Sequence, residues 1–307
     1  MPVPTELKTA DIRESPAHGL GEGDEVVRWD ASNILKIGDR YHVWYSRVRA
    51  GLHRDEVHAP NVLEIWMASS EDGHHWTEHG NVLQPSAAGA WHELGKHAPH
   101  MVPADDGKYY LFFSAICDLH GRDVNVIPPE KHIGLSVADR PEGPFEYVED
   151  TPVLSPSREP EAFDHVLMDD PCVIRRDGKF WLYYKGRSSD TSQCWLGLAT
   201  AEHITGPFEK PQTEPVCDAD WHTGCVWPHR EGVAGIVDWN SLAYSADGLS
   251  FELGAEIGDI GDAGVYCPDA FDDTGEGRGI TWGLSQKGRP RHLYRWDADL
   301  RVTEAGA

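Results

Sequence analysis

The sequence lacks any long apolar run. No stretch approaches the 18 consecutive apolar residues that a membrane-spanning helix requires. The segment Met1–Glu6 has neither the basic region nor the apolar region of a secretion signal. These absences exclude a helical membrane protein for the chain as given, and we expect a soluble, cytoplasmic protein.

Cysteine is scarce, and its spacing follows no pattern. The six cysteines include no CxxC pair, so the sequence predicts neither a zinc framework nor a disulfide framework. Cys172 and Cys225 fall inside β-rich runs, where a thiol behaves as a small buried apolar group. We therefore expect these two thiols to serve packing.

Basic residues are also few. The chain has 27 Lys and Arg against 51 Asp and Glu, which gives a formal net charge of −24. A surface of this sign repels phosphate backbones and anionic lipids, so nucleic acids and membrane surfaces are not expected as partners. The charge also disfavours a polyanionic substrate, and most of these carboxylates are expected to keep the protein in solution.

The segment 169–186 contains the unit from which the rest of the chain is built. The acidic pair Asp169-Asp170 precedes a β-rich run at Cys172–Ile174, and a second run follows at Phe180–Tyr184. Asp177-Gly178 lies between the two runs, and Asp-Gly at such a place is a strong hairpin signal, because its tight turn needs positive φ angles. The segment predicts a carboxylate at the start of an inner strand, followed by a hairpin.

This unit recurs along the chain. Each copy has a turn, a β-rich run and a further β-rich run of matching character, and the turn glycines are Gly38, Gly107, Gly178, Gly232 and Gly277. Repeats of this size with four short strands each are typical of propeller blades. The sequence thus predicts an all-β fold. It is a five-bladed β-propeller with four-stranded antiparallel blades over residues 26–307, after an N-terminal arm over residues 1–25. A β-sandwich with fortuitous hairpins is the alternative.

Acidic residues and histidines stand at the starts of the predicted inner strands. They are Asp30, His97 or His100, Asp170, His222 and Asp269. Because the inner strands of a propeller line its central channel, we expect these side chains to converge at one rim. Inverting glycoside hydrolysis requires such an acid/base set, in which one group activates water and another protonates the leaving oxygen. The alternative for each aspartate is that it only caps a turn.

The same stretches resemble those of known glycosidases. They are Asp30–Ile34 with Tyr41–Arg47, His97–Pro99 with Gly107–Phe112, Asp164–Leu167, Asp170-Pro171 with Gly178–Gly186, and His222 with Val226–Pro228. In these stretches the chain is similar to the five-bladed propeller enzymes of glycoside hydrolase families 43 and 32. It resembles more closely family 117, the 3,6-anhydro-L-galactosidases that act on agar-derived neoagaro-oligosaccharides. The placement of His222 points to family 117, in which a histidine replaces the usual glutamate acid.

The resemblance implies an activity and a set of roles. The activity is that of an exo-acting, inverting glycoside hydrolase that removes a terminal 3,6-anhydro-L-galactose, or a related sugar, from short agar-type oligosaccharides at an α-1,3-linkage. Asp30 is then the general base, Asp170 the second carboxylate that orients the sugar and tunes the acid, and His222 the general acid. Further substrate contacts are expected from Trp29, Asn33, His97, His100, Asp164, His165, Thr223, Tyr266 and Asp269. No cofactor is required, whereas a structural divalent cation in the central channel and a homodimer stay open.

The chain departs from the family pattern in three places. Thr223 stands where the family has Glu, His100 stands where relatives often have Asp, and residues 1–25 are shorter than the family's helical dimerisation segment. The sugar, the linkage, the anomeric outcome and the oligomeric state therefore stay open. Two long polar loops, Arg47–Leu63 and Cys117–Lys131, are expected to close the channel mouth into a pocket, which favours exo-action.

Three other functions also stay open. A family 43-like arabinofuranosidase or β-xylosidase would need a glutamate acid, for which Glu93 and Glu161 are the loop candidates. A propeller without catalytic activity would bind a glycan or a partner. A metal-centred lyase would need ligands from separate blades, although no spacing motif indicates them, and the candidates are His97, His100, His222 and Asp269.

Overall fold

The computed structural model describes most of the chain. The described residues are 2–21, 25–49, 62–117, 119, 128–148, 150–188, 193–222, 225–238, 240–261, 263–273, 277–288 and 291–302. Within them the regular structure is β, apart from one 3-10 helix, η1 (Thr5–Leu7). The predicted all-β class is therefore confirmed. In this part of the chain no helix has the length and apolar character needed to cross a membrane.

The first of three hydrogen-bonded sheets has five strands. They are β2 (Val26–Trp29), β3 (Leu35–Ile37), β4 (Arg40–Arg49), β5 (Glu64–Ser70) and β6 (Trp76–Asn81). The turn between β3 and β4 contains Gly38 at a φ of 63°, as the sequence predicts. Neighbours in this sheet are antiparallel, so local hairpins build it.

The second sheet has seven strands. They are β7 (Lys96–Pro103), β8 (Tyr109–Ile116), β9 (Lys131–Ala138), β10 (Glu146–Tyr147), β11 (Leu167–Arg176), β12 (Lys179–Arg187) and β13 (Trp195–Ala201). A parallel contact between Leu167 of β11 and Lys131 of β9 joins its two antiparallel groups. The Asp177-Gly178 turn separates β11 from β12, which confirms the predicted hairpin.

The third sheet has eight strands and brings the two ends of the described chain together. They are β14 (Val226–Arg230), β15 (Gly232–Val237), β16 (Ser241–Ser245), β17 (Glu252–Glu256), β18 (Ala263–Val265), β19 (Gly277–Lys287), β20 (His292–Arg301) and β1 (Arg13–Pro16). β1 lies in the N-terminal arm, yet it pairs with β20 from Arg13 opposite Asp297 to Pro16 opposite Tyr294. The arm is thus a structural part of the last strand group.

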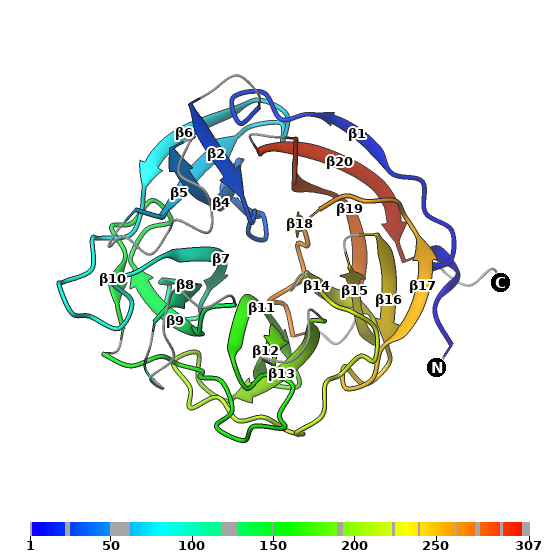
Figure 1. The fold of residues 1–307 in the computed structure, drawn as a ribbon. Helices are drawn as coiled ribbons and strands as arrows, with labels where there is room; N and C mark the ends of the chain where they lie inside the picture. Colours follow the sequence, from blue (N-terminus) through cyan, green and yellow to red (C-terminus); the bar gives the residue numbers. More distant parts are fainter. Residues whose placement is uncertain are drawn as a thin grey trace.

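The strands are arranged in a ring. Figure 1 shows β7, β11, β14 and β18 nearest the centre, and β1 beside β20 at the rim. Large apolar side chains fill the spaces between successive groups: Trp44 of β4, Met101 of β7 and Phe113 of β8 belong to one buried cluster. Because neighbouring groups bury apolar faces against each other, the polar starts of the inner strands are left to meet at the centre.

Candidate active site

Three strand starts share an unusual backbone conformation. Asp30, Ala98 and Asp170 have φ angles of 49°, 48° and 49°, in the left-handed region that residues other than glycine seldom adopt. The pairing register of the strand also shifts at Ala98 and at Asp170, which marks a β-bulge. Bulges re-aim side chains and are frequent beside active sites. The chain therefore repeats one local geometry in three successive strand groups.

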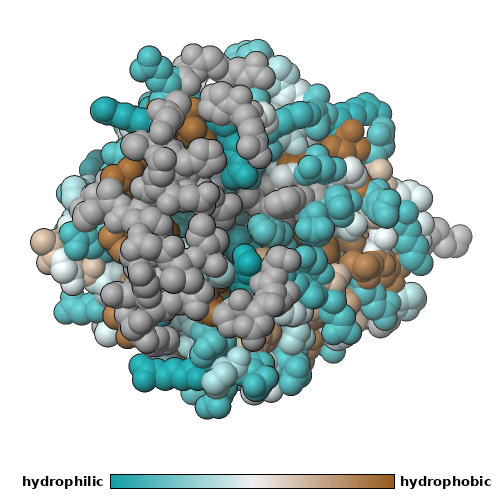
Figure 2. Space-filling view, in the orientation of Figure 1, coloured by the Kyte–Doolittle hydropathy of each residue, from teal (hydrophilic) through white to brown (hydrophobic). Residues whose placement is uncertain are grey.

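Asp30 and Asp170 line the same pocket. The other lining residues come from the inner strands and the residues next to them, and include Ala98, Cys225 and Cys267. In Figure 2 most of the described residues near the middle of the face are hydrophilic, which suits a polar ligand better than an apolar one. The structure thus brings together two carboxylates that are far apart in the sequence.

Asp30 is held by side chains of two other strands. Ser46 of β4 donates a hydrogen bond from Oγ to Asp30 Oδ2 at 3.3 Å. The backbone N–H of Asp30 donates to Gln286 Oε1 of β19 at 3.3 Å. Asp30 is 9% exposed, so it reaches the pocket from a largely buried position.

Asp170 is held by a lysine. Lys185 of β12 donates from Nζ to Asp170 Oδ2 at 2.5 Å, and the backbone N–H of Asp170 donates to Ser114 Oγ at 3.2 Å. The side chain of Asp170 is 14% exposed and that of Lys185 is 5% exposed. Solvent therefore screens this ion pair weakly, and the attraction between the two charges is strong.

A second carboxylate, Asp169, lies behind this pair. Its Oδ2 is 2.5 Å from Lys131 Nζ and 3.3 Å from Lys185 Nζ, and its Oδ1 is 3.1 Å from His97 Nε2. Burial acts to raise the pKa of Asp169, but the ammonium groups of Lys131 and Lys185, together with His97, hold that pKa well below its usual range. Asp169 is therefore a buried carboxylate that two lysines keep ionised.

His222 lies on the Asp170 side of the site. Its Nδ1 is 3.7 Å from the Sγ of Cys194, and the backbone N–H of Cys194 donates to Asp220 Oδ1 at 2.9 Å. Burial raises the pKa of the Cys194 thiol, and the charges of Lys185 and Asp170 also act on it, so these groups are neighbours. His222 is half-buried and is outside the pocket lining given above. That His222 converges with Asp30 at one rim stays a prediction.

Two of the predicted substrate contacts support the pocket from below. The Asn33 side chain donates to the Met101 carbonyl at 2.8 Å and accepts from the Met101 N–H at 2.9 Å. His100 Nε2 lies 3.0 Å from the Val173 carbonyl, and burial lowers the pKa of His100 to about 4. The imidazole is therefore neutral at pH 7 and donates to that carbonyl. Both residues line the pocket while they tie inner strands together.

Four other predicted contacts are engaged within the fold. Trp29 is 2% exposed, and Tyr266 packs edge-on against Tyr41. Asp164 is 1% exposed and accepts hydrogen bonds from Tyr184 and Lys210, both at 2.7 Å. His165 Nδ1 is 3.1 Å from the Ser157 carbonyl. The roles of these residues toward a substrate stay predictions.

Asp269 is separated from the other strand-start residues. It lines a second hollow together with Asp177 of the β11–β12 turn, at the opposite end of β11 from Asp170. Its Oδ2 accepts hydrogen bonds from the N–H of Arg278 at 2.7 Å and from Arg278 Nε at 3.1 Å. Asp269 is therefore not in the lining that Asp30 and Asp170 share, although its neighbours Cys267 and Ala270 are.

Several predicted features lie outside the described residues. They are Thr223 and most of the two long loops, Arg47–Leu63 and Cys117–Lys131. Sequence reasoning, in turn, missed the network of Asp169, Lys131 and Lys185. A signal was present, because Lys185 interrupts an otherwise apolar run in a predicted strand, and a buried lysine needs a carboxylate partner.

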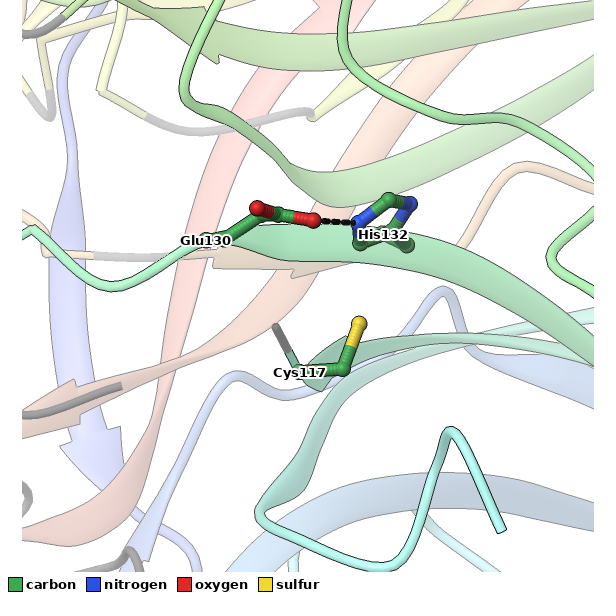
Figure 3. Close-up of side chains that lie close together, drawn as sticks. All are labelled: Cys117, Glu130 and His132. Atoms are coloured by element: carbon green, nitrogen blue, oxygen red, sulfur yellow. Dashed lines mark hydrogen bonds and ion pairs between the residues drawn. The ribbon is translucent and has the colours of Figure 1, made fainter. Parts of the chain in front are cut away.

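Two groups of side chains could hold a metal ion. One contains Cys194, Asp220 and His222, and the other contains Cys117, Glu130 and His132. Figure 3 shows the second group, in which His132 Nε2 is 2.5 Å from Glu130 Oε1. Two ligands of one tetrahedral zinc keep roughly 3.3 Å between them, so this separation fits a hydrogen bond better. None of these six residues is in the pocket lining, and a cation in the channel stays a prediction.

All six cysteines are described and buried, and none of them forms a disulfide in this structure. Cys172 lies in β11 and Cys225 lies directly before β14, as expected for packing groups.

Comparison with solved structures gives matches over nearly the whole chain. A family 117 glycoside hydrolase of the marine bacterium Zobellia galactanivorans has a TM-score of 0.83 and 27% identity, with 97% of this chain and 93% of that chain covered. A family 43 enzyme of Xanthomonas citri, solved with xylose, has a TM-score of 0.58 and 15% identity, over 93% of this chain and 89% of that one. No family model matches the sequence.

Curated relatives match over shorter segments. A β-xylosidase of Xylanibacter ruminicola is 33% identical over 109 residues, which is 34% of this chain and 28% of the relative. A xylosidase/arabinosidase of Humicola insolens is 34% identical over 120 residues, which is 39% of this chain and 30% of the relative. The chain thus spans less than a third of these relatives in the matches. The predicted resemblance to family 117, within the wider group of propeller glycosidases that resemble family 43, is confirmed.

Proposed function

We propose that this chain is a glycoside hydrolase whose active site is the pocket between Asp30 and Asp170. The observation that carries the proposal is that both carboxylates line one pocket from strand starts with the same left-handed backbone, in different strand groups. Similarity to glycoside hydrolases over 97% of the chain supports it. Most glycoside hydrolases have a pair of carboxylates beside the bond that they cleave.

In the proposed mechanism the three sequence-predicted residues have different roles. Asp30, oriented by Ser46, takes a proton from the attacking water. Asp170 is fixed by Lys185 in its ionised form, so it acts as a negative charge toward the sugar and the acid and not as a proton donor. His222 protonates the leaving oxygen, and because its Nδ1 faces Cys194, Nε2 is the nitrogen assigned to that transfer. Inversion would require water and acid on opposite faces of the sugar.

The proposed substrate is a short agar-type oligosaccharide that ends in 3,6-anhydro-L-galactose at an α-1,3-linkage, cleaved from its end. Support comes from the relative with the TM-score of 0.83, which is a family 117 enzyme.

We also propose that the ring is a five-bladed propeller with four-stranded blades. The innermost strands of four blades would then be β7, β11, β14 and β18, and the innermost strand of the fifth blade would be β4 or one of its neighbours.

A second candidate is a β-xylosidase or arabinofuranosidase. The names of both curated relatives favour it, and they match at higher identity, although over shorter segments. This candidate would need a glutamate acid in place of His222. The two candidates therefore differ in substrate and in the residue that protonates the leaving group.

A substrate panel tests the proposal. Purified protein would be incubated with neoagaro-, arabino- and xylo-oligosaccharides, and the products would be identified by mass spectrometry. We expect release of a terminal sugar from the neoagaro series, and Asp30→Asn should lower the rate by ~10²–10⁴-fold while binding stays within about tenfold. Asp105→Asn is the control, because the Asp105 side chain is 90% exposed and pairs with Arg175, away from the pocket lining.

Two outcomes would contradict the proposal. Asp30→Asn retaining more than about a tenth of the wild-type rate would exclude Asp30 as the base. Cleavage restricted to xylo- or arabino-oligosaccharides would replace the proposed substrate with that of the second candidate.

A further inference from the structure

Lys185 occupies a position that repeats around the ring with a different residue. Ser46 of β4 pairs with Trp29, and Ser114 of β8 pairs with His97, each directly before a left-handed residue. In the third group the corresponding pair is Lys185 with Asp169. The position is therefore serine in two strand groups and lysine in the group that carries Asp170.

The two serines hydrogen-bond to the next bulge of the ring. Ser46 Oγ accepts from the backbone N–H of Ala98 at 2.9 Å, and Ser114 Oγ accepts from the backbone N–H of Asp170 at 3.2 Å. These bonds support the bulges. Ser46 also donates to Asp30, the carboxylate of its own strand group, and Lys185 makes the equivalent bond to Asp170 with a positive charge. The position that holds an uncharged serine in two strand groups thus holds a charged lysine in the third, next to the pocket carboxylate Asp170.

The lysine is itself held in place from behind. Its Nζ lies 3.3 Å from Asp169 Oδ2, and that oxygen lies 2.5 Å from Lys131 Nζ. The side chains of Asp169, Lys131 and Lys185 are 1%, 7% and 5% exposed. Two ammonium groups therefore face two carboxylates in a nearly dry place, where removal of one member leaves the others poorly compensated.

We propose that Lys185 is a positioning residue that keeps Asp170 ionised and directed at the pocket, with Asp169 and Lys131 as its support. The effect of Lys185 on catalysis, as distinct from its effect on the charge of Asp170, rests on the proposed function. The charged and titratable groups around Asp170 are Lys185 on β12, Asp169 on β11, Lys131 on β9, His97 on β7, and Cys194 and His222 before β13 and β14. Lys185 contacts the Asp170 carboxylate directly, with 2.5 Å between Nζ and Oδ2.

The test is a titration of the Asp170 carboxyl. Protein labelled with ¹³C at aspartate carboxyls would be titrated by NMR, with Asp170→Asn used to assign the signal. In Lys185→Met the midpoint of Asp170 should rise by roughly one to three pH units, because a neighbouring cation is lost. Lys185→Arg should restore most of the wild-type midpoint. Lys185→Gln keeps a hydrogen-bond donor without the charge and serves if Lys185→Met does not fold.

The matched control is Glu130→Gln. Glu130 and His132 flank Lys131 in sequence and form a buried pair of their own, with side chains 3% and 0% exposed. This variant also disturbs a buried, hydrogen-bonded pair, and the partner of Glu130 in that pair is His132. We expect a loss of thermal stability with the Asp170 midpoint unchanged. If the role of Lys185 were merely structural, Lys185→Met would also lose thermal stability and leave the Asp170 midpoint unchanged.

The outcomes separate this inference from the proposed function. An unchanged Asp170 midpoint in both Lys185→Met and Lys185→Gln would overturn it. A raised midpoint with no cleavage of any oligosaccharide would support the role of Lys185 and contradict the proposed function. If cleavage is found, the pH profile of kcat/KM should move with the Asp170 midpoint in Lys185→Met, and should not move in Glu130→Gln.

Discussion

His100 links the protonation of one residue to the stability of the protein. The side chain is buried beneath the pocket, and its Nε2 lies 3.0 Å from the Val173 carbonyl. Burial disfavours the charged imidazolium and lowers the pKa of His100 from 6.5 to about 4. The unfolded chain therefore binds a proton at higher pH than the folded protein does.

Stability should consequently fall as the pH falls from about 6.5 to about 4. In that range the unfolded state binds more protons, so the free energy of unfolding rises with pH, by roughly 3 kcal/mol over the whole window for this residue. His100→Gln keeps a donor for the carbonyl and does not titrate. Urea unfolding of both proteins at pH 7 and pH 4.5 should show a smaller pH effect in His100→Gln, and equal pH effects would contradict the neutral, buried histidine.

His222 is the residue on which the assignment of the acid depends. A histidine acid must carry its proton, and an unperturbed imidazole loses it near pH ~6.5. The rate should therefore fall on the alkaline side of the pH profile. His222→Gln should flatten that limb and lower the rate by ~10²–10⁴-fold on natural substrates.

Substrates with activated leaving groups give the control for His222. They need little protonation, so His222→Gln should affect them less than it affects natural oligosaccharides. The comparison is made by measuring kcat/KM for both kinds of substrate in the wild type and the variant. Equal losses on both would indicate that His222 shapes the pocket and does not transfer the proton.

At the scale of the strand, the β11–β12 hairpin explains why Asp170 has a lysine beside it. The Asp177-Gly178 turn sets the register as far as Cys172, which pairs with Tyr183, and the bulge at Asp170 then shifts the pairing by one residue, which places Lys185 opposite Asp169. Side chains alternate between the faces of a strand, so a shift by one residue would turn Lys185 away from both carboxylates. The tight turn and the bulge together thus determine the surroundings of a carboxylate that lies at the other end of the hairpin.

Asp169→Asn tests this buried network. The change leaves Lys131 and Lys185 without one of their carboxylate partners, and we expect a loss of about 3–5 kcal/mol in the free energy of unfolding at pH 7. The pKa of Asp169 is lowered in the folded state, so its stabilisation is present above the unfolded-state pKa of about 4 and is lost as the pH falls toward the folded-state pKa. Urea unfolding should therefore show the two proteins converging below pH 4, and a constant difference would contradict the ionic origin of the effect.

At the scale of the whole molecule, the N-terminal arm closes the ring. β1 pairs with β20, and Glu6 accepts hydrogen bonds from Arg230 Nε at 2.7 Å and Nη2 at 3.1 Å. Leu7 is completely buried in the cluster formed with Trp227 and Trp296. Each strand group of a ring contacts only its neighbours. Contacts between the first and last parts of the chain are therefore what close the ring.

Leu7→Ala should therefore act as a core mutation although it lies near the start of the chain. We expect a loss of about 2–5 kcal/mol, as for other fully buried leucines. Lys8→Ala is the control, because Lys8 is exposed and should change the free energy of unfolding by no more than about 0.5 kcal/mol. Equal urea midpoints for Leu7→Ala and the wild type would show that the arm unfolds separately from the ring.

The sequence by itself determined the local features of the fold. The Asp177-Gly178 turn, the apolar runs that became β8, β9, β12 and β13, and the polar starts of β7 and β11 could be read directly. Turn chemistry and side-chain alternation depend on neighbours in the sequence, so no distant contact is needed to predict them. For the same reason Asp30 and Asp170 could be selected together, since both stand at the same point of a repeated unit.

Tertiary structure alone decided which of the selected residues meet. Asp269 stands at a similar point of the sequence, yet it pairs with Arg278 at the opposite end of β11. The pairing of β1 with β20, and the contact of Lys131 on β9 with Asp169 on β11, join segments that are far apart in the chain. Such contacts depend on register, on the left-handed bulges and on how each strand group packs against the next. These are properties of the whole ring, and no local stretch of sequence encodes them.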